Sequence, residues 1–396
     1  MYEIKLHDKH VEKFKEKYPL IFKESVVGYQ LLETSDIEEG QLLKLTDSKG
    51  KFVATGYYGL QNKGLGWVLS NNEREKIDDT FFLKKLYQSI EKRLGLYNNP
   101  KTTAFRVFNG EGDGIGGLTI DFYAGSYLIN YYSKGIYAFK NQIEKALKNS
   151  VEFDAIYEKC RFDDHEEVND GFIAGKPLTF PITVLENGVK LSVFFNEGGM
   201  VGVFLDQREI RKAIRNQYAK GKTVLNTFSY TGAFSTFAAI GGAKSVTSID
   251  LANRSLEHTL KNYELNHISP ENHPILVEDV FHYFKFAQKK GLHFDLVILD
   301  PPSYAKSKDF TFSAEKDYPT LLADAIKITS QKGIIIASNN SSNITLDKFK
   351  QLVGKGFNLA NKRFKILEVH QLPKDFRTHF KYEESNYLKV LFIQMD

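Results

Sequence analysis

The sequence lacks several features that would define whole classes of protein. It contains a single cysteine, Cys160, in 396 residues. One thiol cannot build a disulfide framework or a cysteine-based zinc site within the chain, and it favours a reducing, cytoplasmic setting. No apolar run approaches the roughly 18 residues that cross a bilayer. The charged N-terminal segment is not typical of a signal peptide. We therefore expect no membrane association and no metal site.

An excess of charge of one sign is also missing. Lys and Arg number 53 against 49 Asp and Glu, so the formal net charge is only +4. Such a balance permits a nucleic-acid partner without requiring one. The length indicates two or three domains, and the 42% hydrophobic content is normal for a globular protein.

Phosphate-binding glycines are absent from the most informative stretch, residues 223–250. This stretch begins with an apolar β-type run at 224–228, which is followed by a tight turn at 229–232. A helix of small residues comes next, and then a second β-type run that ends on Asp250. This order predicts a parallel nucleotide-binding sheet. The turn has one glycine, Gly232, where a dinucleotide's pyrophosphate needs GxGxxG. An adenosine ligand without phosphates, such as S-adenosylmethionine (SAM), therefore fits best. An ordinary βαβ unit without a ligand is the alternative.

The order of patterns along the chain predicts three domains, at 1–72, 73–185 and 186–396. Short, closely spaced strands in the first predict a small β-barrel. The second reads as α+β, with a helix from Asn71 to about Leu94 and a glycine-rich turn that lacks the Lys-Ser/Thr of a P-loop. In the third, alternating β and α patterns predict a doubly wound parallel sheet with an antiparallel end.

Three acids fall at successive strand ends of the third domain. Asp250 suits a ribose diol, Asp279 can accept from an adenine amino group, and Asp300 opens an Asp-Pro-Pro turn. The carboxyl ends of parallel strands line one crevice, so these side chains should converge. Pro301 and Pro302 would stiffen the turn beside the reacting centre.

A further acid precedes the 223–250 stretch by one helix. Asp206, with Glu209 three residues on, has the spacing of a capping box for a helix that runs to about Ala219. Its position before the nucleotide-binding stretch makes a ligand role for Asp206 and its neighbours the alternative interpretation.

The segments NTFSYTGAFS, VEDVF, ILDPPSYAKSK and FLDQR together resemble the class I SAM-dependent methyltransferases that modify large-subunit ribosomal RNA. GEGDGIGGLTID and the N-terminal β-rich module resemble the three-part branch of that family, which has a PUA RNA-binding domain, a linking α+β domain and a Rossmann-like catalytic domain. The resemblance implies an α/β fold, SAM as cofactor, S-adenosylhomocysteine as product, and 23S rRNA or a large-subunit assembly intermediate as partner. It implies SAM contacts at these residues: Asp206, Gln207, Arg208, Asn226, Phe228, Ser229, Tyr230, Gly232, Asp250, Leu251, Asp279, Val280 and Asp300.

One departure from that family bears on mechanism. Members that methylate C5 of cytosine first add a cysteine thiolate to C6, from the segment after the strand that follows Asp-Pro-Pro. Here that segment, 337–342, reads ASNNSS and has no cysteine. Serine is a far weaker nucleophile without an adjacent base, and Cys160 is expected to be a buried strand-end residue. Cytosine-C5 chemistry is therefore the less favoured alternative.

The same segment favours a ring nitrogen as target. Ser303, rather than an aromatic residue, follows Asp-Pro-Pro, which disfavours an exocyclic amino group, and SNN resembles the guanine-N7 methyltransferases of large-subunit RNA. Guanine N7 has a lone pair and no proton, so in-line placement supplies most of the catalysis. We expect Asn339, Asn340 and Tyr304 to position the base, while Asp300, Pro301 and Pro302 shape the reaction centre. The alternative is that the asparagines only cap the next helix.

RNA binding is a separate expectation. The basic residues that could bind phosphates of the RNA backbone are Lys306, Lys308, Arg363, Lys365, Arg377 and Lys381. A rival function is a non-catalytic RNA-binding or ribosome-assembly factor that holds SAM as a structural ligand. An NAD-type oxidoreductase is disfavoured by the missing GxGxxG. The sequence leaves a homodimer open.

Overall fold

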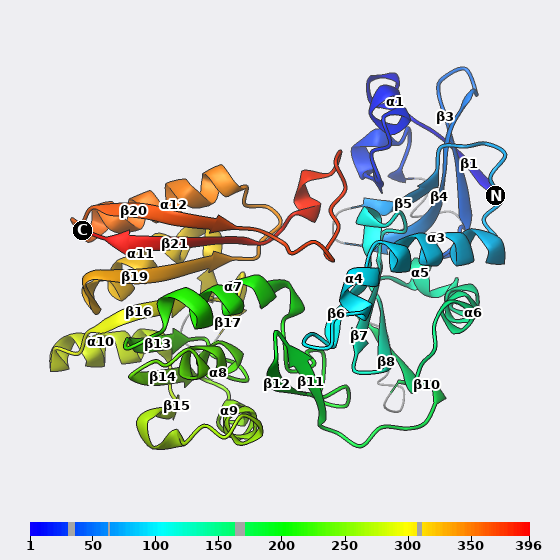
Figure 1. The fold of residues 1–396 in the computed structure, drawn as a ribbon. Coiled ribbons are helices and arrows are strands. Elements are labelled where there is room, and N and C mark those ends of the chain that lie inside the picture. Colours follow the sequence, from blue (N-terminus) through cyan, green and yellow to red (C-terminus); the bar gives the residue numbers. More distant parts are fainter. Residues whose placement is uncertain (31–35, 62–63, 163–170, 307–310) are drawn as a thin grey trace. The chain divides into compact units, whose positions relative to one another are not determined.

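The structure is a computed structural model that describes residues 1–30, 36–61, 64–162, 171–306 and 311–396 (Figure 1). Contacts divide these residues into two units. The first unit comprises Met1–Phe180, Phe195–Gly199 and Lys374–Ser385, and the second comprises Pro181–Phe194, Met200–Pro373 and Asn386–Asp396. The division at 72 and 185 remains a prediction. None of the described helices has the length and apolar character to cross a membrane.

The first unit contains two five-stranded sheets. The first sheet has the order β1-β3-β4-β5-β2 and the second the order β10-β9-β8-β7-β6. A bridge between Leu6 and Val26 joins the segments that follow the two edge strands of the first sheet. The strands are β1 (Tyr2–Lys5), β2 (Leu20–Ile21), β3 (Leu42–Thr46), β4 (Phe52–Gln61), β5 (Gly64–Ser70), β6 (Ala104–Asn109), β7 (Leu118–Tyr123), β8 (Ser126–Tyr131), β9 (Ala155–Cys160) and β10 (Phe172–Gly175).

Short helices connect these strands. They are α1 (Asp8–Lys15), α3 (Asp79–Glu91), α4 (Leu94–Tyr97), α5 (Lys134–Tyr137) and α6 (Lys140–Ser150), with 3₁₀ turns η1 (Lys23–Ser25) and η2 (Gly110–Gly112). The helix expected from Asn71 begins at α3, eight residues later. Asp78 caps it by accepting from the backbone N–H groups of Thr80 and Phe81, which fixes the start there.

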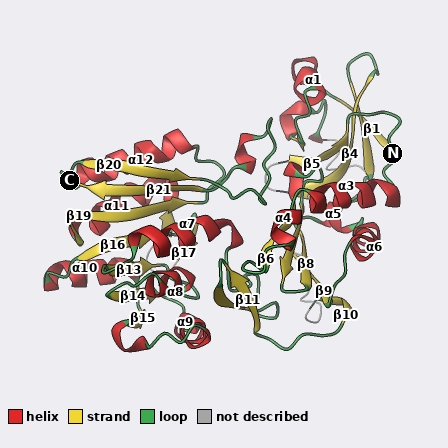
Figure 2. Ribbon diagram, in the orientation of Figure 1, coloured by secondary structure: helices red, strands yellow, loops and turns green. Residues whose placement is uncertain are grey.

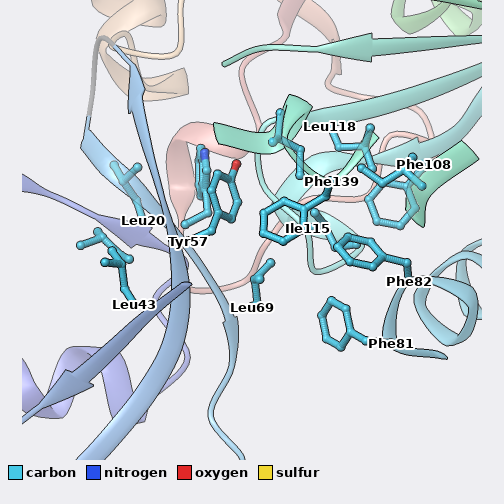
Figure 3. Packing of buried hydrophobic residues seen from close by; sticks show 14 of the residues in the cluster. Leu20, Leu43, Tyr57, Leu69, Phe81, Phe82, Phe108, Ile115, Leu118 and Phe139 are labelled. Atoms are coloured by element: carbon cyan, nitrogen blue, oxygen red, sulfur yellow. The ribbon is translucent and has the colours of Figure 1, made fainter. Parts of the chain in front are cut away.

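The two sheets of the first unit share one hydrophobic core (Figure 3). Leu43 and Leu69 from the first sheet belong to the same buried cluster as Phe82 of α3 and Phe108 of β6. The hydroxyl of Tyr57 donates to the buried carbonyl of Gly116 at 2.8 Å. This continuous core explains why residues 1–180 form one compact unit.

The second unit is built on a seven-stranded sheet of order β15-β14-β13-β16-β19-β21-β20. All neighbours from β15 to β19 are parallel, and β21 is antiparallel to both of its partners. The strands are β13 (Thr223–Thr227), β14 (Ser245–Asp250), β15 (Ile275–Val277), β16 (Phe294–Leu299), β19 (Thr329–Asn339), β20 (Phe364–His370) and β21 (Lys389–Met395). Two hairpins stand apart from this sheet: β11 (Ile182–Glu186) with β12 (Val189–Val193), and β17 (Tyr304–Lys306) with β18 (Thr311–Ser313).

Helices cover both faces of the sheet (Figure 2). The helical elements are η3 (Leu205–Gln207), α7 (Arg208–Ala213), the π-helical turn η4 (Ile214–Tyr218), α8 (Ala233–Ile240), α9 (Arg254–Leu265), η5 (Pro270–Asn272), α10 (Val280–Lys290), α11 (Ala314–Lys327) and α12 (Leu346–Leu359). Leu225 packs with α10, α11 and α12, while its neighbour Val224 packs with α7 and α8. Alternate residues of each strand thus face opposite helical layers. The predicted Rossmann-like fold with an antiparallel end is confirmed.

Candidate functional site

Strand order fixes where a ligand can bind in the second unit. β13 lies between β14 and β16, so the connections leave it in opposite directions. In open α/β sheets the crevice at this reversal, outside the carboxyl ends of the strands, is the ligand site. Thr227 ends β13, and Asp300 follows β16 directly. The predicted site residues in 226–232, 250–251, 279–280 and 300 all lie at or beside this edge.

The turn after β13 is held in an uncommon conformation. Phe228 and Tyr230 have φ of 53° and 52°, in the left-handed region that side chains rarely adopt. The Ser229 N–H donates to the carbonyl of Ile249 at 2.9 Å, and the Tyr230 N–H donates to Asp250 Oδ2 at 2.8 Å. The end of β14 therefore fixes the turn after β13. Strain of this kind gathers at ligand sites when the surroundings hold it in place.

Gly232 is required for a reason that the sequence did not reveal. Its φ is 69°, and a Cβ built there would lie 2.4 Å from Cγ2 of Thr259 on α9. The sequence attributed this glycine to close approach of a ligand. The structure shows a packing contact with α9, in addition to the left-handed conformation, that excludes a larger residue.

Two of the strand-end acids already organise backbone. Asp250 accepts from Tyr230 and, through Oδ1, from the Ala252 N–H at 2.9 Å. Asp279 caps α10 by accepting from the His282 N–H at 2.9 Å. Each carboxylate oxygen can accept more than one hydrogen bond. Both residues can therefore act as caps and still receive a ribose or adenine donor.

Asp300 is the acid with the most perturbed environment. The Nε2 of Gln207 lies 3.2 Å from both of its carboxylate oxygens and 3.2 Å from Oγ of Ser338. Burial raises the pKa of Asp300 to about 6, and the negative charge of Asp206 acts in the same direction. A cationic ligand beside two acids would reverse this effect and favour the charged carboxylate.

Asp206 is not the helix cap that the sequence predicted. It lies in the turn η3, and the residue preceding α7 is Gln207, whose side chain makes no capping hydrogen bond. Oδ2 of Asp206 instead accepts from the hydroxyl of Tyr387 at 2.8 Å. The capping-box prediction was wrong because a 3₁₀ turn precedes the helix and moves its start to Arg208.

A buried ion pair holds this segment in place. Arg211 donates through Nε and Nη2 to the two oxygens of Glu186 at 2.6 and 2.7 Å, and the side chains are 2% and 1% exposed. Nη2 of Arg211 also donates to the carbonyl of Phe204 at 2.7 Å. The β11–β12 hairpin is thereby fixed to α7 and to η3, which carries Asp206 and Gln207.

The two predicted asparagines lie where β19 ends. Asn339 is buried, and its Oδ1 accepts from the Ser341 N–H at 3.0 Å. Asn340 is exposed, and its Oδ1 accepts from the hydroxyl of Ser303, the residue after Asp-Pro-Pro. Thr345, not an asparagine, caps α12. The structure thus brings the Asn339–Asn340 segment and the Asp300–Ser303 turn together.

Lys389 is a buried residue that the sequence analysis missed. It pairs with Asn339 across β19 and β21 and is 1% exposed. Its Nζ donates to the carbonyls of Ser341 and Tyr387 at 2.6 and 2.7 Å. Burial lowers the pKa of Lys389 to about 8. Neither Lys389 nor Tyr387 belongs to a recognisable motif. Their connection to the site becomes visible only in the fold, where Lys389 pairs with Asn339 and Tyr387 donates to Asp206.

The remaining predicted residues have mixed surroundings. Val280 is buried, Leu251 is 63% exposed, and Arg208 is buried with Nε 3.4 Å from Glu209. Tyr304 is 63% exposed. Lys308 lies outside the described residues. Within the described ranges, no group of three or more His, Cys, Asp or Glu side chains could hold a metal ion.

The site's chemistry suits SAM. Oγ of Ser229, Oε1 of Gln207 and Oδ1 of Asn226 are buried and have no hydrogen-bond partner in the described part of the chain. Ser229 and Gln207 lie beside the carboxyl edge, where a ligand's amino or hydroxyl groups could satisfy them. Asp250, Asp279 and Asp300 place carboxylates at or beside the carboxyl edge, and Asp206 lies close enough to Asp300 to raise its pKa, which favours a cationic ligand. Fold and site together define a Rossmann-like domain for a cationic adenosine ligand.

Comparison with known proteins agrees with this class. Residues 143–357 match a family described as S-adenosylmethionine-dependent methyltransferase, and residues 4–71 match the PUA-like domain. The chain belongs to this family of SAM-dependent methyltransferases, and SAM is its cofactor. The first sheet of the first unit is its PUA-like domain.

Relatives of high coverage align with nearly the whole chain. A Bacillus subtilis (strain 168) protein named "Putative ribosomal RNA large subunit methyltransferase YwbD" is 52% identical, over 97% of both chains. The "Ribosomal RNA large subunit methyltransferase I" of Aeromonas salmonicida (strain A449) is 30% identical, over 96% of this chain and 95% of the relative. The crystal structure of SMU.776, titled "a putative methyltransferase complexed with SAH", superposes with a TM-score of 0.92 at 37% identity and covers 100% of both chains.

Proposed function

We propose that this enzyme methylates large-subunit ribosomal RNA, and that its target atom is N7 of a guanine in 23S rRNA. The names of the relatives support the RNA substrate. The single observation that favours N7 is the segment after β19, which places Asn340 beside the Asp-Pro-Pro turn and contains no cysteine.

The surroundings of the one cysteine disfavour covalent catalysis. Cys160 ends β9 in the first unit and is half-buried. Burial, and then the charge of Glu158, raise its pKa to about 11. A thiol with that pKa is almost entirely protonated at neutral pH and is a poor nucleophile. C5 methylation of cytosine needs such a nucleophile.

Guanine N7 makes smaller demands on the protein. SAM supplies an electrophilic methyl group when bound. N7 accepts that group through its lone pair, and no proton leaves, so no general base is needed. The side chains then have to exclude water and orient the base, which accounts for the catalysis.

We assign the orientation of the base to three residues. The Oδ1 of Asn340 is engaged by Ser303, while its Nδ2 makes no hydrogen bond within the described ranges. This amide can donate to guanine O6, the acceptor next to N7. Tyr304, with 63% of its surface exposed, offers a ring on which the base can stack. Asn339 holds the turn that carries Asn340.

The other assigned residues act on the cofactor. Asp250 would bind the ribose and Asp279 the adenine amino group, while Asp300, with Gln207, would face the cationic end. The 23S rRNA, as naked RNA or as an assembly intermediate, is the proposed partner. The single cysteine fits a cytoplasmic setting.

Mapping of methylated nucleotides in 23S rRNA tests the target atom. A strain lacking this gene should lose one 7-methylguanosine, and a plasmid copy should restore it, whereas an Asn340→Ala copy should restore it poorly. Loss of a 5-methylcytosine in the deletion strain would contradict the assignment.

A further inference from the structure

The segment Lys374–Ser385 connects β20 to β21 of the second unit but packs within the first unit (Figure 1, red segment before β21). Its first anchor is Asp375, which is 2% exposed. Nη2 of Arg93 donates to the Asp375 carbonyl at 2.6 Å, and the Arg106 N–H donates to Oδ2 of Asp375 at 3.0 Å. Phe376 is buried, and the Cζ atom of the Arg106 guanidinium lies over its ring, 4.4 Å from the ring centroid.

A second anchor holds the other end of the segment. Tyr382 is 5% exposed and packs edge-on against Trp67 and Tyr18, with both pairs of ring centroids 5.7 Å apart. Oγ of Ser385 donates to the Tyr382 carbonyl at 2.6 Å and accepts from the His379 N–H at 2.9 Å. Residues 377–381 are therefore a short outward loop fixed on both sides.

This loop exposes a phenylalanine. Phe380 is 75% exposed, although it belongs to the most hydrophobic class of side chains. Its ring stacks on His379, with centroids 5.2 Å apart and planes 20° from parallel. Burial and the charge of Lys17 lower the pKa of His379, so its ring is neutral at physiological pH. The fixed loop thus holds a ring that stacks on His379, lies 5.9 Å from the Lys381 ammonium and leaves most of its surface exposed to solvent.

Several cations gather around one buried acid at the start of this loop, while Lys381 at its end is paired with Glu16 at 2.7 Å. Asp113 is fully buried and forms a two-pronged ion pair with Arg93, at 3.0 and 2.6 Å. Lys92 and Arg377, 40% and 43% exposed, lie 3.9 and 3.6 Å from the same carboxylate. One acid thus faces three cations, and two of these cations reach the solvent.

A cavity of about 390 Å³ adjoins the loop on the first unit. Its charged lining residues are Lys17, Lys85, Glu75 and Glu111, and His379 also lines it. A hollow of this size can hold a nucleoside-sized group, while its two lysines are balanced by two glutamates and give no preference for a phosphate. His379 links the cavity to the exposed ring of Phe380.

We propose that Phe380 is a stacking platform for an unpaired base of single-stranded RNA, with Arg377 and Lys92 binding the flanking phosphates. The inference rests on the proposed RNA substrate and adds a binding site on the first unit. Aromatic rings bind unpaired bases by stacking, and nearby cations follow the backbone. A duplex keeps its bases stacked internally, so an isolated ring on a loop favours a single strand.

Fluorescence anisotropy of the full-length protein with labelled 12-nucleotide RNA tests this site. The probes are oligo(U), oligo(A) and an RNA duplex of equal length. Phe380→Ala should weaken single-strand binding about 5- to 150-fold, the range for loss of one base–aromatic stack. Phe380→Trp keeps a ring and should bind like the wild type. Tyr87→Ala, which removes a 50% exposed aromatic ring elsewhere on the first unit, is the matched control.

Equal affinities of wild type and Phe380→Ala would overturn the site, as would an equal loss in Tyr87→Ala or a preference for the duplex. Loss of binding to a ribosomal protein, with RNA affinity unchanged, would also overturn it. Thermal unfolding and SAM titration of the same preparations verify that each variant is folded. Methyl transfer to 23S rRNA by the wild type is measured in parallel, so that failure of the proposed function is distinguishable from failure of this site.

Discussion

At the scale of single residues, Asp300 links the cofactor crevice to the turn that carries the proposed base-binding residues. Asp300 follows β16 and accepts a hydrogen bond from Nε2 of Gln207. Burial raises its pKa to about 6, and the negative charge of Asp206 acts in the same direction. Its charge therefore changes in a range where binding can be measured. With this pKa the Asp300 carboxyl is mostly charged at neutral pH and mostly protonated at pH 5, and a bound cation would favour the charged form further.

SAM affinity should depend on pH through Asp300. Below pH 6 the carboxyl is protonated and above it is charged, so affinity for the cation should rise by about tenfold from pH 5 to pH 7. The stability of the ligand-free protein should change oppositely. The raised folded pKa gives a contribution that is full below about pH 4 and lost as pH rises through 6. Isothermal titration across this range tests the first effect. An unchanged pH profile in Asp300→Asn would contradict it.

Lys389 should act on the reaction without touching the cofactor. Lys389→Met keeps the length of the side chain but removes both hydrogen bonds to the Ser341 and Tyr387 carbonyls. Asn340 would then be less well placed, and small misplacements cost about 10- to 100-fold in rate. We expect kcat to fall by that factor while the SAM dissociation constant stays constant. Lys332→Met, which changes an exposed lysine of β19, the strand that pairs with β21, is the control. Wild-type kcat in Lys389→Met would refute the role.

Residue roles could be predicted only where a local pattern carries them. Asp250, Asp279 and Asp300 end or follow apolar strands, so their places at the carboxyl edge could be predicted, while their roles stay predictions. Lys389 sits within an apolar strand pattern and becomes notable only because β21 pairs with β19. Phe380 resembles any other aromatic residue until its exposure is known.

At the scale of elements, the turn from β13 to α8 depends on a contact with α9. Gly232→Ala places a Cβ 2.4 Å from Thr259 at a positive φ. The left-handed conformation alone costs about 1–2 kcal/mol for a residue other than glycine. We expect lower stability in urea unfolding and weaker SAM binding. Adding Thr259→Ala should recover part of the loss, because the steric portion is relieved. If stability does not recover in the double variant, the left-handed backbone conformation, and not the contact with Thr259, is the reason for the glycine.

The β11–β12 hairpin should stabilise the second unit through Arg211 and Glu186. Removing one member of a buried pair leaves an uncompensated charge and costs about 3–5 kcal/mol. We expect that loss in Arg211→Ala and in Glu186→Ala, measured by denaturant unfolding. The double change Arg211→Met with Glu186→Leu should cost less than either single change. A larger loss in the double variant would contradict this account.

Elements were predicted well where hydrophobic period and turn residues agree. The seven strands of the large sheet in the second unit follow such signals, whereas the β17–β18 hairpin was not predicted. Errors arose at helix starts. Asn71 and Asp206 both have residue types typical of a cap, but the helices begin at Asp79 and Arg208, where the described hydrogen bonds place them.

At the scale of the whole molecule, the order of segments along the chain differs from their grouping by contact in the fold. Residues 195–199 and 374–385 come from the catalytic part of the sequence but belong to the first unit by contact. Arg93 and Asp375 are 282 positions apart along the chain. Periodicity describes neighbours a few residues apart and carries no information about such contacts. The assignment of Lys374–Ser385 therefore required the structure.

Transfer of a labelled methyl group tests the central claim most directly. Purified protein, SAM with a trideuterated methyl group, and 23S rRNA from the deletion strain are incubated together, and the digested RNA is analysed by mass spectrometry. The account predicts trideuterated 7-methylguanosine at one position and none with Asn340→Ala at early times. Labelled 5-methylcytosine, or an absence of label in RNA despite SAM binding, would contradict it.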